Sequence, residues 1–186
     1  IKVIALTRSE WKTKKKFANY EGRKDLKLIV KDVIIPPKIA GKIDFIIHAA
    51  SQSSPKYFKK DPVGTLLPNV VGTKNLLDLA RVKKSEAFLF ISSGEVYGNV
   101  LKPQKKIRET DIGFVDSLDI RSCYAESKRL GETMCIAWSN QFKVNTKIAR
   151  PFHIYGPGMD LDDGRIFADF TRNIVKSQNL QILSDG

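Results

Sequence analysis

Two residues four positions apart, Tyr124 and Lys128, have the types and the spacing of a proton-transfer pair. They open a long helical pattern, and residues at i and i+4 lie one above the other on a helix face. A tyrosine phenol titrates near ~10 in water, which is too high for a base at neutral pH. A neighbouring cation favours the phenolate, so Lys128 is expected to lower the pKa of Tyr124. The same spacing is also common on solvated helices.

The segment FISSGEVYG at residues 90–98 strengthens this interpretation, because an apolar strand runs directly into a polar cluster. The cluster contains Ser92, Ser93 and Glu95. In a parallel α/β sheet, sites form outside the carboxyl ends of the strands, which is where this cluster is expected. The alternative is structural: Ser93 and Glu95 would cap a loop or a neighbouring helix.

Further segments occur in order along the chain, and together with these residues they resemble a known family. It is the family of extended short-chain dehydrogenase/reductases that act on nucleotide sugars, and within it the chain most resembles the UDP-glucuronate decarboxylases. The matching segments cover most of the chain from residue 30 onward: IHAAS at 47–51, NVVGTKNL at 69–76, SSGEVYG at 92–98, RSCYAESKR at 121–129, GETM at 131–134, residues 150–156 and DGR at 163–165.

The resemblance implies a role for each residue of the polar cluster. Tyr124 would take the proton from the sugar C4 hydroxyl, and Lys128 would lower its pKa and contact the nicotinamide ribose. Ser93 would share the C4 oxygen, and Glu95 would assist proton handling near C5. His153 would contact the substrate, at a place where the family more often has asparagine.

Gly94 helps to discriminate among the reactions of this family. In the sugar 4,6-dehydratases the corresponding residue resembles an aspartate that supplies the acid for loss of water at C6. Glycine carries no acid. Decarboxylation needs none, because oxidation at C4 creates a β-keto acid that loses carbon dioxide. The sequence therefore favours decarboxylation or C4 epimerisation over dehydration.

The resemblance also implies bound NAD, used as a recycled oxidant at the sugar C4. The residues that would hold the cofactor are Asp32, Val33, Ala49, Ala50, Ser51, Tyr124, Lys128 and Arg8. Thr7 and Arg8 stand where an acidic residue usually binds the adenosine ribose, and Arg8 could accept a 2′-phosphate. NAD is expected, with NADP as the alternative. With two histidines in the chain, no metal site is expected.

The elements that must position these residues alternate between strands and helices, which predicts an α/β fold with a Rossmann-like doubly wound parallel sheet. A single, partial NAD-binding domain over residues 1–186 is expected. Strands are predicted over 1–6, 26–30, 43–48, 87–92, 144–149 and 180–183, and helices over 9–20, 68–83, from about 122, and over 164–177.

Two packing expectations accompany these elements. The apolar run at 43–48 lacks strict alternation and predicts a strand buried on both faces. The helix from about 122 is expected to turn four residues inward: Leu130, Met134, Ala137 and Trp138.

No glycine occurs between Ile1 and Gly22, whereas a glycine-rich phosphate-binding turn should follow the first strand of such a sheet. The chain is therefore expected to enter at the second strand, with the place of the first strand lying between strands 1–6 and 43–48. It ends at Gly186, before the family's distal substrate-binding portion and its late arginine. A non-catalytic fragment or binding scaffold is a further alternative.

The composition limits the classes of partner that are expected. The 186 residues carry a net charge of +12. The lysines stand in small scattered groups without interleaved aromatic residues, which indicates a solvated surface and no nucleic-acid partner. No membrane span or signal-peptide pattern occurs. Cys123 and Cys135 lie too far apart on one predicted helix to form a disulfide, which predicts reduced thiols and a cytoplasmic location. The expected partners are a UDP- or other nucleotide sugar and, at full length, a second copy.

Overall fold

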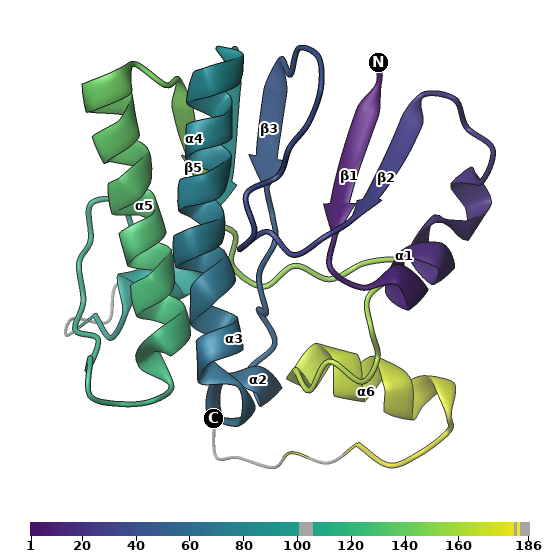
Figure 1. The fold of residues 1–186 in the computed structure, drawn as a ribbon. Helices are drawn as coiled ribbons and strands as arrows, with labels where there is room; N and C mark the ends of the chain where they lie inside the picture. The colour runs from purple at the N-terminus through teal and green to yellow at the C-terminus, as the bar shows by residue number, and fades with distance from the viewer. Residues whose placement is uncertain (101–105, 181, 183–186) are drawn as a thin grey trace.

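The computed structural model describes residues 1–100, 106–180 and 182, and its strands are all parallel. A two-stranded sheet pairs β1 (Val3–Thr7) with β2 (Leu26–Val30). A three-stranded sheet has the order β3 (Phe45–His48), β4 (Ala87–Ile91) and β5 (Thr146–Ala149). Figure 1 shows the two sheets as successive parts of one layer.

Helices connect the strands and give the α/β, Rossmann-like fold that the sequence predicts (Figure 1). The α-helices are α1 (Glu10–Phe17), α2 (Lys56–Lys60), α3 (Pro62–Leu67), α4 (Thr73–Lys83), α5 (Ser122–Phe142) and α6 (Ile166–Val175). Two 3₁₀ helices, Ala18–Tyr20 and Gly94–Tyr97, and a π-helix, Pro68–Gly72, complete them. The predicted N-cap Ser9 is confirmed, because its side chain accepts a hydrogen bond from the Lys12 amide.

The hydrophobic core lies where α4 and α5 pack against the three-stranded sheet (Figure 1). Its fully buried members include Leu77, Phe88, Phe90 and Cys135. Gly131 explains how close α5 comes to β4, because a Cβ atom at this position would overlap the Phe90 ring. This close approach sets the distance between the end of β4 and the face of α5 that carries Tyr124 and Lys128.

The expectation that β3 is buried on both faces is wrong. Ile46 and His48 are buried, but Phe45 and Ile47 are 65% and 67% exposed. Successive strand residues point to opposite faces. The helices α4 and α5 cover only one of these faces (Figure 1).

The expected inward face of α5 is also partly wrong. Met134 and Trp138 pack against the core, but Leu130 is 45% exposed and Ala137 is also exposed. Gly131 and Cys135 take the buried positions beside Phe90. The prediction placed the buried face of α5 at its apolar residues, whereas the closest contact with the sheet is made by Gly131.

The edges of β1 and β3 that face each other are unpaired within the described residues, where β1 pairs with β2 and β3 with β4. Figure 1 shows this division between the sheets, at the place predicted for a further strand. The carboxyl ends of β1 and β3 still converge, because Leu6 packs against the core cluster that contains Ile46.

Two predictions about segments remain. Residues 181 and 183 of the predicted strand 180–183 lie outside the described residues. Among the described residues, every helix is either too short or too polar to span a lipid bilayer.

Candidate active site

One cavity collects the residues predicted to perform the chemistry. It has a volume of about 870 Å³ and lies at the carboxyl ends of β3, β4 and β5. Its lining includes all five residues to which proton transfer or sugar binding was assigned: Ser93, Glu95, Tyr124, Lys128 and His153. Ser93 also caps the 3₁₀ helix that follows it, since its Oγ accepts a hydrogen bond from the Glu95 amide at 3.2 Å. The structural and chemical interpretations of Ser93 are therefore compatible.

The ammonium group of Lys128 is held by the end of β4. Its Nζ donates a 2.7 Å hydrogen bond to the Ile91 carbonyl oxygen and lies 5.0 Å from the centroid of the Phe90 ring. The residue is 2% exposed. Burial lowers its pKa to about 8, against an opposing effect of the Glu132 carboxylate. Lys128 is thus a desolvated cation fixed in one orientation.

Tyr124 lies one turn before Lys128 and stacks on Phe58, with the ring centroids 4.8 Å apart. Burial raises the pKa of its phenol, while the Ser93 hydroxyl and the Arg165 charge act in the opposite direction. This differs from the expectation that Lys128 lowers the pKa of Tyr124. Burial of the phenol is the largest effect, and the Lys128 ammonium is directed to the Ile91 carbonyl, 5.7 Å from the centroid of the phenol ring.

Glu95 is paired with Arg121, the residue before α5. The guanidinium donates to both carboxylate oxygens at 3.4 Å. Both side chains line the cavity and are partly exposed. Arg121 belongs to the segment RSCYAESKR, yet sequence reasoning gave it no role.

A second ion pair fixes α5 to the ends of β4 and β5. Arg150 donates to both carboxylate oxygens of Glu132, at 2.9 and 2.7 Å. Ser92 donates to the same carboxylate at 2.5 Å. Because Ser92 lies between Ile91 and Ser93, this contact sets the register in which Lys128 meets Ile91.

A buried polar network joins the π-helix to the face of α5 that carries Tyr124 and Lys128, and sequence reasoning missed it. The Asn69 side-chain amide donates to the Thr65 carbonyl and to Ser127 Oγ, both at 3.0 Å. Ser127 in turn donates to the Tyr124 carbonyl at 2.9 Å. A π-helix shifts backbone hydrogen bonds out of the i→i−4 pattern. The Asn69 side chain donates to the i−4 carbonyl, which belongs to Thr65. Its second hydrogen bond connects the π-helix to Ser127, the residue before Lys128.

His48 belongs to the same interior and is a hydrogen-bonded packing residue. Its Nε2 lies 3.2 Å from the Pro68 carbonyl oxygen and 3.1 Å from Thr73 Oγ1. Burial, followed by the charge of Lys128, lowers its pKa from 6.5 to about 4. The imidazole is therefore neutral in the folded protein at pH 7.

This burial predicts an acid-sensitive fold. Between pH 6.5 and about 4 the unfolded chain binds a proton at His48 that the folded chain does not, so the free energy of unfolding falls as the pH falls through this window. The contribution is ~3 kcal/mol, present in full above pH 6.5. Urea denaturation of wild type and His48→Asn at pH 7.5 and 4.5 would measure it, with a shallower pH slope expected in the variant. Exposed His153→Gln is the control, and equal slopes in wild type and His48→Asn would contradict the prediction.

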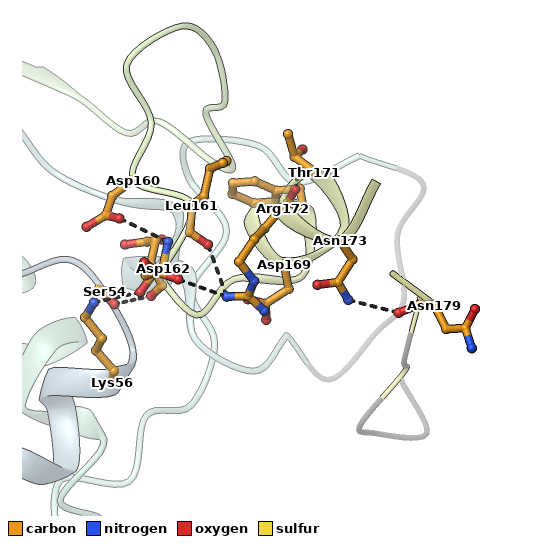
Figure 2. Close-up of polar contacts among 12 residues, drawn as sticks. Ser54, Lys56, Asp160, Leu161, Asp162, Asp169, Thr171, Arg172, Asn173 and Asn179 are labelled. Atoms are coloured by element: carbon orange, nitrogen blue, oxygen red, sulfur yellow. Dashed lines mark hydrogen bonds and ion pairs between the residues drawn. The ribbon is translucent and has the colours of Figure 1, made fainter. Parts of the chain in front are cut away.

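A clip between two distant segments lies beside the cavity, whose lining includes Ser53, Pro55 and Arg165 from the same segments. Ser54 Oγ donates to the Asp163 carbonyl at 2.5 Å, and Lys56 Nζ donates to the Asp162 carbonyl at 2.8 Å. Figure 2 shows these contacts continuing to Arg172 on α6, which pairs with Asp162 at 3.3 Å. Arg165 adds a 2.8 Å hydrogen bond to the Ser53 carbonyl.

Arg165 also lines the cavity, where its charge acts on Tyr124. The sequence offered a signal for it in the DGR segment, but no role was assigned. The clip therefore places a cation in the wall of the cavity.

A smaller cavity of about 400 Å³ adjoins the first, and Ala49 and Ser51 line both. Its lining includes the other residues predicted to hold a cofactor: Arg8, Asp32, Val33 and Ala50. The Oγ of Ser51 is buried, with no hydrogen-bond partner among the described residues. Two adjoining cavities with an unsatisfied hydroxyl between them fit an elongated dinucleotide, whose nicotinamide end would lie near Tyr124 and Lys128.

The parallel sheet, the Tyr124–Lys128 pair and the serine at the strand end are the features by which the chain resembles the extended short-chain dehydrogenase/reductases. The profile of the NAD dependent epimerase/dehydratase family matches residues 3–186. The chain belongs to this family.

Known proteins agree with this assignment. UDP-glucuronic acid decarboxylase 1 of Arabidopsis thaliana is 41% identical over 160 residues, which cover 86% of this chain and 35% of that protein. The Xenopus tropicalis UDP-glucuronic acid decarboxylase 1 is 35% identical, over 93% of this chain and 40% of that protein. The crystal structure of UDP-glucuronic acid 4-epimerase from Bacillus cereus in complex with NAD shares the fold, with a TM-score of 0.81 and 22% identity, over 100% of this chain and 58% of that one. The chain thus spans about a third to a half of the length of the curated relatives it matches.

Proposed function

We propose that the protein modifies a nucleotide sugar by oxidation at C4, and that its reaction is the decarboxylation of UDP-glucuronate. The single observation that carries the reaction class is the environment of Gly94 in the cavity wall. A Cβ atom at Gly94 would lie 2.7 Å from Cδ1 of Phe152, which is closer than side chains approach each other. An acidic side chain therefore has no room here unless Phe152 moves.

This packing disfavours dehydration, which needs an acid at the position of Gly94, and leaves decarboxylation and C4 epimerisation. The decarboxylase relatives of 35–41% identity support the first of these. C4 epimerisation of the same sugar is the alternative, because it too needs no acid at Gly94 and because the Bacillus cereus neighbour is a UDP-glucuronic acid 4-epimerase.

Each residue of the site has a task in this reaction. Tyr124 accepts the proton of the C4 hydroxyl, and Ser93 holds the C4 oxygen. Lys128 contributes a fixed positive charge one helical turn away. Glu95, held by Arg121, handles the proton near C5. The two adjoining cavities would hold the nicotinamide dinucleotide, which when bound would supply reversible hydride transfer at C4.

The experiment is incubation of the full-length protein with UDP-glucuronate. We expect carbon dioxide and a UDP-pentose, identified by mass spectrometry and by trapping of the labelled gas. With a UDP- or dTDP-hexose instead, no 4-keto-6-deoxy sugar is expected, because the site lacks the acid for loss of water.

The Tyr124→Phe protein is the control, because carbon dioxide that it releases does not depend on the proposed base. Formation of UDP-galacturonate without carbon dioxide would identify the epimerase alternative. Efficient formation of the 4-keto-6-deoxy sugar would contradict the reaction class.

A further inference from the structure

The smaller cavity has an unusual balance of charge. It lies beyond the carboxyl ends of β1 and β2, and four cationic side chains line it: Arg8, Lys12, Lys16 and Lys31. Asp32 is the one acidic residue in its lining. The cavity therefore presents an excess of positive charge to any ligand that enters it.

The carboxylate of Asp32 is already used by its own turn, since its Oδ1 accepts a hydrogen bond from the Ile34 amide at 3.1 Å. Lys31 is also engaged, because its Nζ donates to the Pro36 carbonyl at 3.1 Å. Among the described residues, no carboxylate forms an ion pair with the three remaining cations, Arg8, Lys12 or Lys16. Their charge is available to an anionic ligand.

Arg8 has one weak contact. Its Nη2 lies 3.4 Å from Gln52 Oε1, and Gln52 donates in turn to Asp61 Oδ2 at 2.8 Å. Asp61 is the acidic residue at the end of this chain of contacts, and the Gln52 amide separates its carboxylate from the Arg8 guanidinium. A ligand phosphate could replace the Gln52 contact without breaking an ion pair.

Two of the four lysines of α1 line the cavity, and the other two do not. Lys12 and Lys16 are four residues apart, share one face of the helix and line the cavity. Lys14 pairs with Glu10 at 2.8 Å, and Lys15 lies over the Trp11 ring at 5.4 Å from its centroid. The start of this helix is fixed by the Ser9 cap and by a 2.6 Å hydrogen bond from Thr13 Oγ1 to the Ser9 carbonyl.

A dinucleotide that follows both cavities would place its adenosine ribose at this end. In dinucleotide-binding folds, a carboxylate after the second strand of the complete sheet, which corresponds to β1 here, binds the two ribose hydroxyls and repels a phosphate. Arginine and lysine instead bind a phosphate through charge-assisted hydrogen bonds. We infer that the cavity takes the 2′-phosphate of NADP through Arg8, Lys12 and Lys16, so that the protein accepts NADP alongside NAD and binds it more tightly. The inference rests on the dinucleotide site of the proposed function and not on the sugar reaction.

Calorimetric titration of the full-length protein with NADP and with NAD at low ionic strength tests this inference. A charged hydrogen bond contributes a factor of about 10 to 100 in affinity, and we expect NADP to bind tighter than NAD by this factor. Arg8→Gln should remove most of the preference, because it weakens NADP binding more than NAD binding, and Lys12→Gln should remove part of it. The matched control is Lys15→Gln, on the same helix but outside the cavity, which should change neither affinity.

A second measurement uses 2′,5′-ADP and 5′-AMP as probes, which lack the nicotinamide. The first should bind tighter, and added salt should reduce the difference, because the extra contact is electrostatic. Equal or tighter binding of NAD, or equal losses in Arg8→Gln and Lys15→Gln, would overturn the inference while leaving the sugar reaction intact. If neither dinucleotide binds, the cofactor part of the proposed function fails with it.

Discussion

Tyr124→Phe in the full-length protein is expected to lower turnover by on the order of 10²–10⁴-fold, the contribution typical of a general base. The change removes only the hydroxyl, and the ring can still stack on Phe58. Nucleotide-sugar binding should therefore remain largely intact. Steady-state turnover and calorimetric binding of the sugar nucleotide would measure the two quantities separately.

Tyr57→Phe is the matched control, because Tyr57 is only partly buried, lies on α2 and does not line the cavity. It should keep wild-type turnover. If Tyr124→Phe also turned over near the wild-type rate, Tyr124 would not be the base, although the fold and the family would stand.

A polypeptide of residues 1–186 alone is expected to self-associate and to bind NAD poorly. Unpaired strand edges attract other strands, and the edges of β1 and β3 carry exposed apolar side chains: Val3 is 49%, Phe45 65% and Ile47 67% exposed. No glycine-rich turn follows β1 to supply further amides for a pyrophosphate. Light scattering and calorimetric titration with NAD would test both expectations.

The variant Ile47→Lys should reduce the association of this polypeptide, because it places a charge on the exposed face of β3. Ile112→Lys, in a loop where the native side chain is 87% exposed, is the control and should have no effect. A monomer that binds NAD with micromolar affinity would contradict the prediction.

The sequence predicted the parts of the site that depend on local spacing. Tyr124 and Lys128 share a face because four residues make about one helical turn, and the strand end at Ser92 follows from an apolar run that stops at polar residues. Their meeting in one cavity follows from the parallel arrangement of strands, which brings the carboxyl ends together.

Other parts depend on contacts between residues far apart in the chain, which local spacing does not encode. Asn69 meets Ser127 across 58 positions, and Ser92 meets Glu132 across 40. The pKa of Tyr124 was predicted with the wrong sign for a related reason. It depends first on burial of the phenol, to which Phe58 on α2 contributes by stacking on the ring, and the Ile91 carbonyl that holds the Lys128 ammonium is 37 positions away.

The clip beside the cavity is among the last parts of the site to form during synthesis. Its hydrogen bonds join residues 106 to 112 positions apart. Closing such a loop costs ~2 kcal/mol more than closing one ten times shorter, so these contacts form after the local structure. A ribosome adds ~5–20 residues per second, so Ser54 waits roughly 5 to 20 s for its partner Asp163. Because Tyr124 is also made before Asp163, the cavity lacks this clip until the segment that contains Asp163 has been synthesised.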